Sequence, residues 1–318
     1  MIAVSGFIVM LASLIGASFA NTVSQLLVTQ GILYGLGGAF LYFPVFNYID
    51  EWFVKRRGLA YGGLIAGDGI GGVVIPFVME WMLNRFGFRT ALRIWTFVSL
   101  LFVIPALMLL KNHPVYQGKG GVNSKVDLRF LKAKAFWVLV SGNIIPSLGY
   151  FMPSLYLPCE QLPTAVLRLS LTIIIAFAVA CGFSAFSGTV ALSLMNVSIV
   201  VGALIIGALT DRYHVTVTLN ICTIGTVASV FLLWSFAVYQ PIMYAFAIMY
   251  GFFAGAFPAT WSGCSHPVRR VYPVETGMII ALFTAAKGVS SLITGPFSGY
   301  LVEIDVWEGH AGNPEAFN

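Results

Sequence analysis

The sequence predicts an all-α fold, a bundle of helices that cross a membrane several times. Of the 318 residues, 58% are hydrophobic and only 9% are charged, whereas an ordinary soluble domain is about 25% charged. The hydrophobic residues also come in runs long enough to cross a bilayer, which takes about 20 apolar residues. So few charges could not cover the apolar surface of a soluble protein, and we therefore expect a multi-pass integral membrane protein surrounded by lipid.

Charge and cysteine usage exclude several other classes of protein. The net charge is +5, but the basic residues form short clusters between apolar runs, as cytoplasmic loops do. We therefore expect no nucleic-acid partner. The four cysteines show no metal or redox spacing, and no intramembrane cluster of His, Cys or paired carboxylates offers catalytic chemistry. The chain is accordingly not expected to be an enzyme or to need a cofactor or a metal.

The first 110 residues predict four spans. No charged residue occurs from Met1 to Ile49, and the polar segment 21–25 divides this stretch into two spans. The third span covers about 59–83. We expect a loop carrying Arg85, Arg89 and Arg93 to follow it, and then a fourth span over 94–110.

The segment 111–134 is rich in glycine and lysine, which is typical of a linker. It divides an N-terminal helical bundle, 1–110, from a C-terminal bundle, 135–318. The second bundle predicts five spans, at about 136–157, 188–209, 215–239, 241–263 and 277–302.

A further apolar stretch, 169–186, is ambiguous. Basic loops of membrane proteins usually face the cytoplasm. We therefore expect Lys55–Arg57, the 111–134 linker and Arg269–Arg270 to lie on the cytoplasmic side. An even number of spans must then separate the linker from Arg269. We therefore predict that 169–186 does not cross the membrane.

The most distinctive segment reads Trp-Phe-Val-Lys-Arg-Arg-Gly-Leu-Ala-Tyr-Gly, at residues 52–62. Its basic residues can anchor the entry to a span at the anionic cytoplasmic surface. Small residues then recur three or four positions apart in two stripes, which favour close helix packing. The first stripe contains Gly58, Gly62, Ala66 and Gly69, and the second contains Gly63, Gly67 and Gly71.

This segment resembles the signature of the monocarboxylate-transporter branch of the major facilitator superfamily. The matching positions are Phe53, Lys55, Arg56, Arg57, Leu59, Ala60, Gly62, Ala66, Gly67 and Gly71, while Trp52 and Leu64 replace the usual Tyr and Ala. Later segments at 142–144, 153–158, 207–215 and 250–255 are similar to fungal members. The resemblance implies two helical bundles that move a small organic solute by alternating access, with a monocarboxylate and a proton as the expected cargo.

Asp211 and Arg212 resemble the short-loop motif of the same superfamily. In that motif an Asp-Arg pair at a cytoplasmic helix end holds neighbouring helices through charge-assisted hydrogen bonds. The resemblance implies a gating role for the two residues, and an ordinary interfacial ion pair is the alternative.

Two charged residues lie in the middle of predicted spans, where a charge is costly and function is the first suspicion. Family halves are internal repeats, and a weak match between 58–69 and 277–288 puts Asp68 and Lys287 at corresponding places. We expect Asp68 to carry a coupled proton and Lys287 to attract a carboxylate or to pair with an acid. Helix packing is the alternative role for both residues.

Three other polar residues are weaker candidates for contact with a solute. Asn143 and Asn196 lie in spans that flank the expected cavity of the second bundle, and a packing hydrogen bond is the alternative for each. Arg93 heads a span, where it attracts anions or serves as an interfacial anchor.

The sequence also departs from the family pattern. The family has twelve spans, so we expect a major-facilitator fold that lacks the first two and the last spans. The stretch 165–181 has no counterpart and is interpreted as an insertion. The segment 191–209 lacks the charges with which animal members bind lactate. The alternative function is therefore a non-transporting membrane protein, a nutrient sensor or an inactive transporter fragment. For localisation we expect the plasma membrane rather than an organelle.

Overall fold

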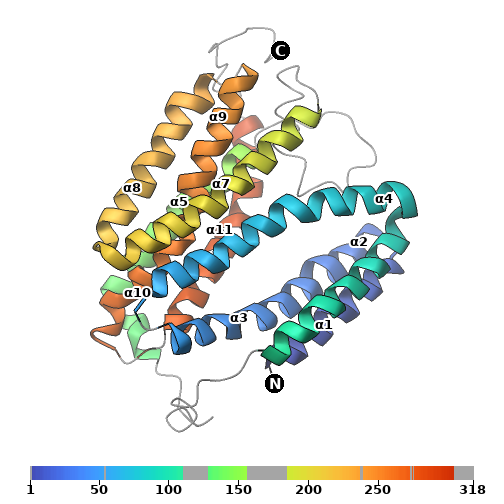
Figure 1. Cartoon of the computed structure of the whole chain (residues 1–318), viewed down its shortest axis with the longest axis horizontal. Helices are drawn as coiled ribbons and strands as arrows, with labels where there is room; N and C mark the ends of the chain where they lie inside the picture. The colour runs from blue at the N-terminus through green and yellow to red at the C-terminus, as the bar shows by residue number, and fades with distance from the viewer. Residues whose placement is uncertain are drawn as a thin grey trace. The chain divides into compact units, whose positions relative to one another are not determined.

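The structure of the chain is a computed structural model that describes residues 2–53, 55–109, 128–155, 185–236, 239–272, 274 and 276–303. The regular structure of these residues is helical and contains no strand (Figure 1). Within them, seven helical stretches are long and apolar enough to cross a membrane, and two shorter helices are also apolar. The predicted all-α membrane class is confirmed.

The chain divides into two compact units. The first unit comprises Met1–Val54, Val74–Asp127 and Glu275–Met278. The second comprises Lys55–Val73, Leu128–Val274 and Ile279–Asn318. Helix α4 (Arg57–Leu109) contributes to both units, as does α11 (Thr276–Glu303).

The first unit begins with two apolar helices that lie side by side, α1 (Ile2–Ser18) and α3 (Tyr34–Trp52), joined through α2 (Val23–Leu26) and η1 (Leu27–Leu33) (Figure 1). Close approach is possible because a Cβ atom on Gly6 would lie only 2.8 Å from the Gly37 carbonyl oxygen. Between the helices, the Thr22 hydroxyl accepts a 3.3 Å hydrogen bond from the Gln25 backbone N–H. This N-cap lies at the predicted break between the first two spans.

Helix α4 changes direction at Gly87, whose φ of +74° is accessible to glycine but strained for other residues. The loop predicted around Arg85, Arg89 and Arg93 is therefore wrong. The helix is kinked at Gly87 without a separate loop, and the three arginines lie in helix. In the first unit, Leu14, Ala17 and Leu92 form a buried apolar cluster.

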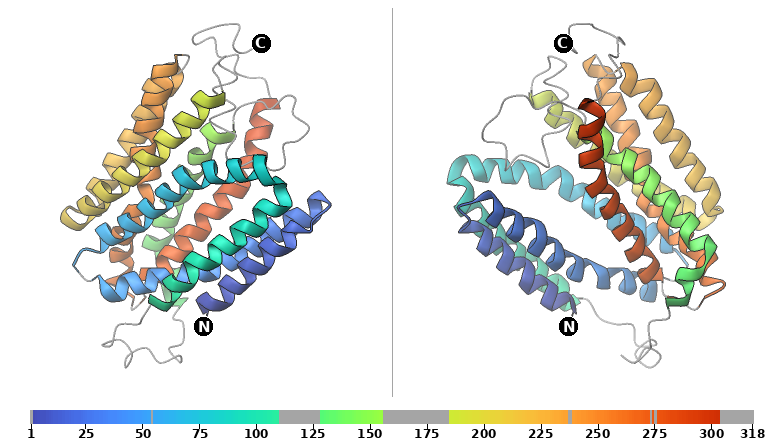
Figure 2. Two further views of the ribbon diagram at one scale, coloured as in Figure 1. Left: turned by 45° about the vertical axis from the view of Figure 1, so that its right-hand side comes forward. Right: turned by 180° about the vertical axis from the view of Figure 1, so that it is seen from behind.

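The second unit contains the other helical segments. They are η2 (Leu128–Lys132), α5 (Lys134–Leu155), α7 (Ala185–Arg212), α8 (Val215–Ala228), η4 (Ser229–Leu233), η5 (Trp234–Phe236), α9 (Gln240–Tyr250), η6 (Gly251–Gly255), η7 (Phe257–Thr260) and α10 (Trp261–Arg269), together with α11 from Ile279 onward. Helices α7, α8 and α9 lie side by side (Figure 2). Their core includes Ala203, Ile206, Cys222, Ala256 and Ala259.

The five predicted spans of the second half each have a helix at the predicted place. Of the predicted linker, residues 111–127 lie outside the described residues, and 128–132 form η2. The stretch 165–181, interpreted as an insertion, also lies outside them. The same holds for the ambiguous stretch 169–186, except that Ala185 and Phe186 begin α7.

One of the two predicted stripes of small residues packs closely against a neighbouring helix. A Cβ on Gly58 would overlap the Gly207 carbonyl of α7, and a Cβ on Gly62 would overlap the Ala203 carbonyl. The second stripe does not share this environment. A Cβ on Gly63 or Gly67 would meet no described atom within 4 Å, so these two positions of the second stripe make no close helix contact.

Candidate functional site

The second unit contains a cavity of about 510 Å³, within the range of sites that bind small molecules. It is lined from four helical segments, chiefly by apolar and aromatic side chains. The lining residues are Asn143, Ile145, Pro146 and Ser147 on α5; Thr223, Thr226 and Val227 on α8; Val230, Phe231 and Trp234 on η4 and η5; Tyr250, Ala254, Phe257, Pro258 and Trp261 on α9 to α10; and Lys287 on α11.

Irregular helix turns shape two walls of this cavity. The span Gln240–Arg269 changes from α-helix to the π-helical η6 and the 3-10 helix η7, where Gly255 and Pro258 interrupt the regular pattern. The facing span contains a second π-helical segment, η4. Such segments widen a helix locally and occur often at functional sites. Irregular backbone is tolerated in a membrane where it is buried in protein or lines a cavity.

Asn143 of α5 presents a polar atom that has no hydrogen-bond partner among the described residues. The side chain is 3% exposed, and its Nδ2 donates a 2.8 Å bond to the Phe283 backbone carbonyl of α11. Its Oδ1 is buried and accepts no hydrogen bond from any described residue. A buried acceptor left without a donor costs about 1–3 kcal/mol.

Trp261, at the start of α10, presents the complementary group. Its side chain is 6% exposed, and its ring packs on Phe283 with centroids 6.1 Å apart. The indole Nε1, which can only donate, is buried without an acceptor in the described part of the chain. The structure describes three such orphan atoms, and the two on Asn143 and Trp261 belong to residues that line the same cavity.

Lys287 supplies a positive charge at the cavity. It is partly buried on α11, one helical turn after Phe283. The carboxylate of Asp68 on α4 interacts electrostatically with its ammonium group. The two mid-span charges that the sequence singled out therefore interact within one unit.

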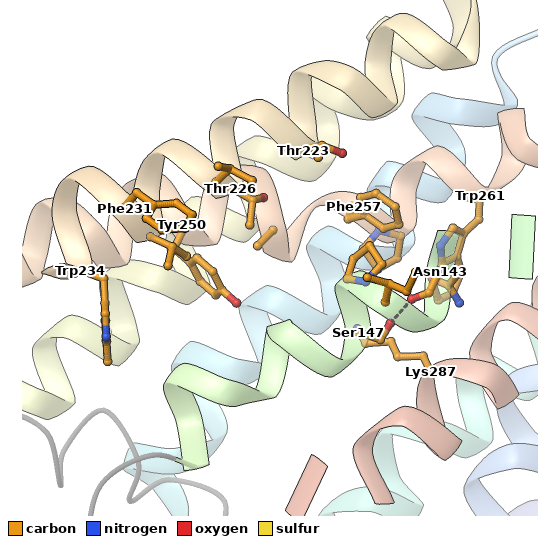
Figure 3. Close-up of a pocket in the computed structure, with 16 residues that line it drawn as sticks. Asn143, Ser147, Thr223, Thr226, Phe231, Trp234, Tyr250, Phe257, Trp261 and Lys287 are labelled. Carbon is orange, nitrogen blue, oxygen red and sulfur yellow. Dashed lines mark hydrogen bonds between the residues drawn. The ribbon is translucent and has the colours of Figure 1, made fainter. Parts of the chain in front are cut away.

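The labelled side chains gather at two sides of the cavity (Figure 3). Trp234, Phe231 and Tyr250 lie at one side, and Asn143, Trp261 and Lys287 at the other. One side thus offers aromatic surface, and the other offers an acceptor, a donor and a cation. This arrangement suits a solute with an apolar body and a polar end.

Two of the predicted solute contacts lie elsewhere. Asn196 does not line the cavity. Its Nδ2 donates to the Leu192 carbonyl at 3.0 Å, and its side chain packs where a Cβ on Gly72 would stand. In the first unit, the Arg93 guanidinium lies 4.8 Å from the ring centroid of Phe19, and its Nε is 3.4 Å from the Ser18 hydroxyl.

Asp211 at the end of α7 makes the contacts of a helix cap. Its Oδ1 accepts a 2.7 Å hydrogen bond from the Gly58 backbone N–H, and its Oδ2 a 2.8 Å bond from that of Leu59. These N–H groups lie at the start of α4, where they have no partner within the helix and where a negative charge is favoured. Arg212 beside it is exposed.

The other signature residues lie around the start of α4. Lys55 and Arg56 are exposed just before the helix, and Arg57 is partly buried at its first position. Gly71 lies further along α4 and is partly buried. None of these residues lines the cavity.

The contribution of Trp261 and of the aromatic residues on η4 to α9 was not predicted. The only signal in the sequence was the concentration of Gly251, Gly255 and Pro258 within one span, which predicts broken helix. No group of three or more His, Cys, Asp or Glu in the described ranges could hold a metal ion.

Comparison with known proteins defines the family. The family model of the Major Facilitator Superfamily matches residues 1–196, more than half of the chain. The chain belongs to the Major Facilitator Superfamily. This major-facilitator chain is 26% identical to the MFS-type transporter pynF of Aspergillus niger over 303 residues, 95% of the chain and 65% of that relative.

Two further relatives show similar identity and coverage. The MFS transporter asaE of Aspergillus flavus is 26% identical over 90% of the chain and 61% of its own length. The Fujikurins efflux protein of Gibberella fujikuroi is 27% identical over 98% of the chain and 61% of its own length. The major-facilitator chain thus spans less than two thirds of the length of these relatives.

Proposed function

We propose that the chain moves a small organic solute across a membrane by secondary active transport, with the cavity of the second unit as the solute site. The observation that carries this proposal is the pair of buried polar atoms, Asn143 Oδ1 and Trp261 Nε1, on residues that line an otherwise largely apolar cavity. Binding sites for small molecules combine apolar walls with a few placed polar groups. Family membership and the transporter names of its relatives support the same conclusion.

The cavity favours a cargo with a substantial apolar part. Phe231, Trp234 and Phe257 offer more aromatic surface than a short-chain acid can cover. One relative is named for the efflux of fujikurins, which supports export as the direction of transport. A carboxylate on the cargo would be attracted by Lys287, so an acidic solute with an apolar body fits both the walls and the charge.

Proton coupling rests on Asp68 in this proposal. Its carboxylate acts electrostatically on Lys287, so protonation of Asp68 would change the field at the solute site. We assign to Asp68 the role of carrying the coupled proton. For gating we assign the cap between Asp211 and the start of α4, which must open if α7 and α4 separate during a transport cycle.

The test is a metabolite-exchange experiment at the plasma membrane, where we expect the protein to reside. Cells that lack their own exporters would express the chain or carry an empty vector. Mass spectrometry would then compare organic solutes inside the cells and in the medium. We expect at least one solute to move from cells to medium with the chain present and to stay inside when a protonophore is added.

The transport proposal would be contradicted by identical solute profiles with and without the chain, provided that the protein is detected in the membrane. Binding of a solute without movement would instead identify a sensor.

A further inference from the structure

The two buried polar atoms in the cavity are chemically complementary to each other. Asn143 Oδ1 can only accept a hydrogen bond, and Trp261 Nε1 can only donate one. Each could be satisfied by water, but water satisfies any polar group and selects no solute. A solute edge that carries a donor beside an acceptor would satisfy both groups at once.

The two residues are held in place by the same neighbour. Phe283 of α11 accepts the hydrogen bond from Asn143 Nδ2 through its backbone carbonyl, and its ring packs against the ring of Trp261. The Asn143 amide is thereby oriented, because its Nδ2 is already engaged at 2.8 Å. This contact leaves Oδ1 as the atom with hydrogen-bonding capacity to spare.

We infer that the solute is recognised through a donor–acceptor edge, such as that of a cyclic amide, whose N–H donates to Asn143 Oδ1 and whose carbonyl oxygen accepts from Trp261 Nε1. The positive charge of Lys287 at the same side of the cavity favours the carbonyl oxygen. The aromatic side chains Phe231, Trp234 and Tyr250 at the other side take the apolar part of the solute (Figure 3). The inference rests on the proposed function in treating this cavity as the solute site.

Two probes of nearly equal size and shape test the edge. 2-Quinolone is a planar bicyclic amide with a ring N–H beside its carbonyl, and coumarin has a ring oxygen in place of that N–H. Equilibrium dialysis of each probe against the purified full chain in detergent micelles gives the two affinities. Micelles without protein correct for partition of the probes into detergent.

We expect 2-quinolone to bind the wild-type chain about three- to tenfold more tightly than coumarin. This is the difference in affinity that one neutral hydrogen bond, here from the ring N–H to Asn143 Oδ1, contributes. Asn143→Leu removes the acceptor and should bring the ratio of the two affinities close to one. Trp261→Phe should weaken both probes by a similar factor, because both carry the carbonyl. Trp234→Phe makes the same substitution at the aromatic side of the cavity and serves as the control. It should leave the ratio of the two affinities unchanged, and it should weaken the binding of both probes less than Trp261→Phe does.

Equal affinity of the wild type for the two probes, or a ratio that survives Asn143→Leu, overturns the inference, and so does failure of both probes to bind. These outcomes are separate from the fate of the transport proposal, because binding is measured without flux. If the probes bind as expected but no solute moves in cells, the transport proposal is contradicted and the inference about recognition by Asn143 and Trp261 stands. If solute moves in cells but the two probes bind equally well, the transport proposal stands and the inference about recognition is contradicted.

Discussion

The carboxylate of Asp211, at the end of α7, accepts a 2.7 Å hydrogen bond from the backbone N–H of Gly58, 153 residues earlier in the chain. Helix α7 also approaches closely at Gly58, since a Cβ there would overlap the Gly207 carbonyl. The cap and the close helix contact therefore lie at the same place. The signature segment of α4 and the Asp-Arg motif of α7 form one contact.

Removal of the cap should weaken this contact. Asp211→Ala leaves the N–H groups of Gly58 and Leu59 without their charged acceptor, which we expect to cost about 1–2 kcal/mol. Thermal unfolding of the purified chain in detergent would measure the loss. Arg212→Ala changes the adjacent exposed residue and serves as the control, and equal midpoints for the two variants would contradict the capping role.

The close packing of α4 on α7 predicts opposite outcomes at two neighbouring glycines. Gly62→Ala would place a Cβ against the Ala203 carbonyl, and we expect the helix contact to lose about 1–3 kcal/mol. Gly63→Ala meets no described atom within 4 Å and should leave stability unchanged or slightly higher. Equal unfolding midpoints for Gly62→Ala and Gly63→Ala would show that α4 and α7 are not in contact at Gly62.

The unpaired acceptor in the cavity predicts that a polar residue can be removed without loss of stability. Asn143→Leu removes the buried Oδ1, which has no partner in the described part of the chain, together with the Nδ2 bond to the Phe283 carbonyl. The two effects offset each other, so the empty protein should unfold at nearly the same temperature. Asn196→Leu makes the same change on α7, where the amide bonds to Leu192 and packs at Gly72. That control should be destabilised, and an equal loss in both variants would contradict a site at Asn143.

The sequence was sufficient for the class of fold and for most helix positions, because long apolar runs allow few alternatives in a membrane. It failed around Arg85–Arg93. The three arginines predict a loop there, whereas α4 is only kinked at Gly87 and Arg93 packs on Phe19. Spacing of charges cannot distinguish a loop from a helix whose arginines contact aromatic rings.

The candidate site was predictable only in part. Asn143 and Lys287 stood out as polar groups inside apolar runs, and both line the cavity. Asn196 had the same appearance but packs against α4, because helix periodicity does not say which neighbour a face meets. Trp261 was missed, since a tryptophan in a span is ordinary until its N–H is known to be buried without an acceptor.

The most direct test of the cavity as the transport site is the metabolite-exchange experiment with Lys287→Ala and Ser291→Ala. Lys287 lines the cavity, whereas the Ser291 hydroxyl donates to the Lys287 backbone carbonyl one turn further along α11 and does not line it. At equal levels in the membrane, Lys287→Ala should abolish the solute movement seen with the wild type, and Ser291→Ala should retain it. Wild-type movement in the Lys287→Ala variant would contradict the account.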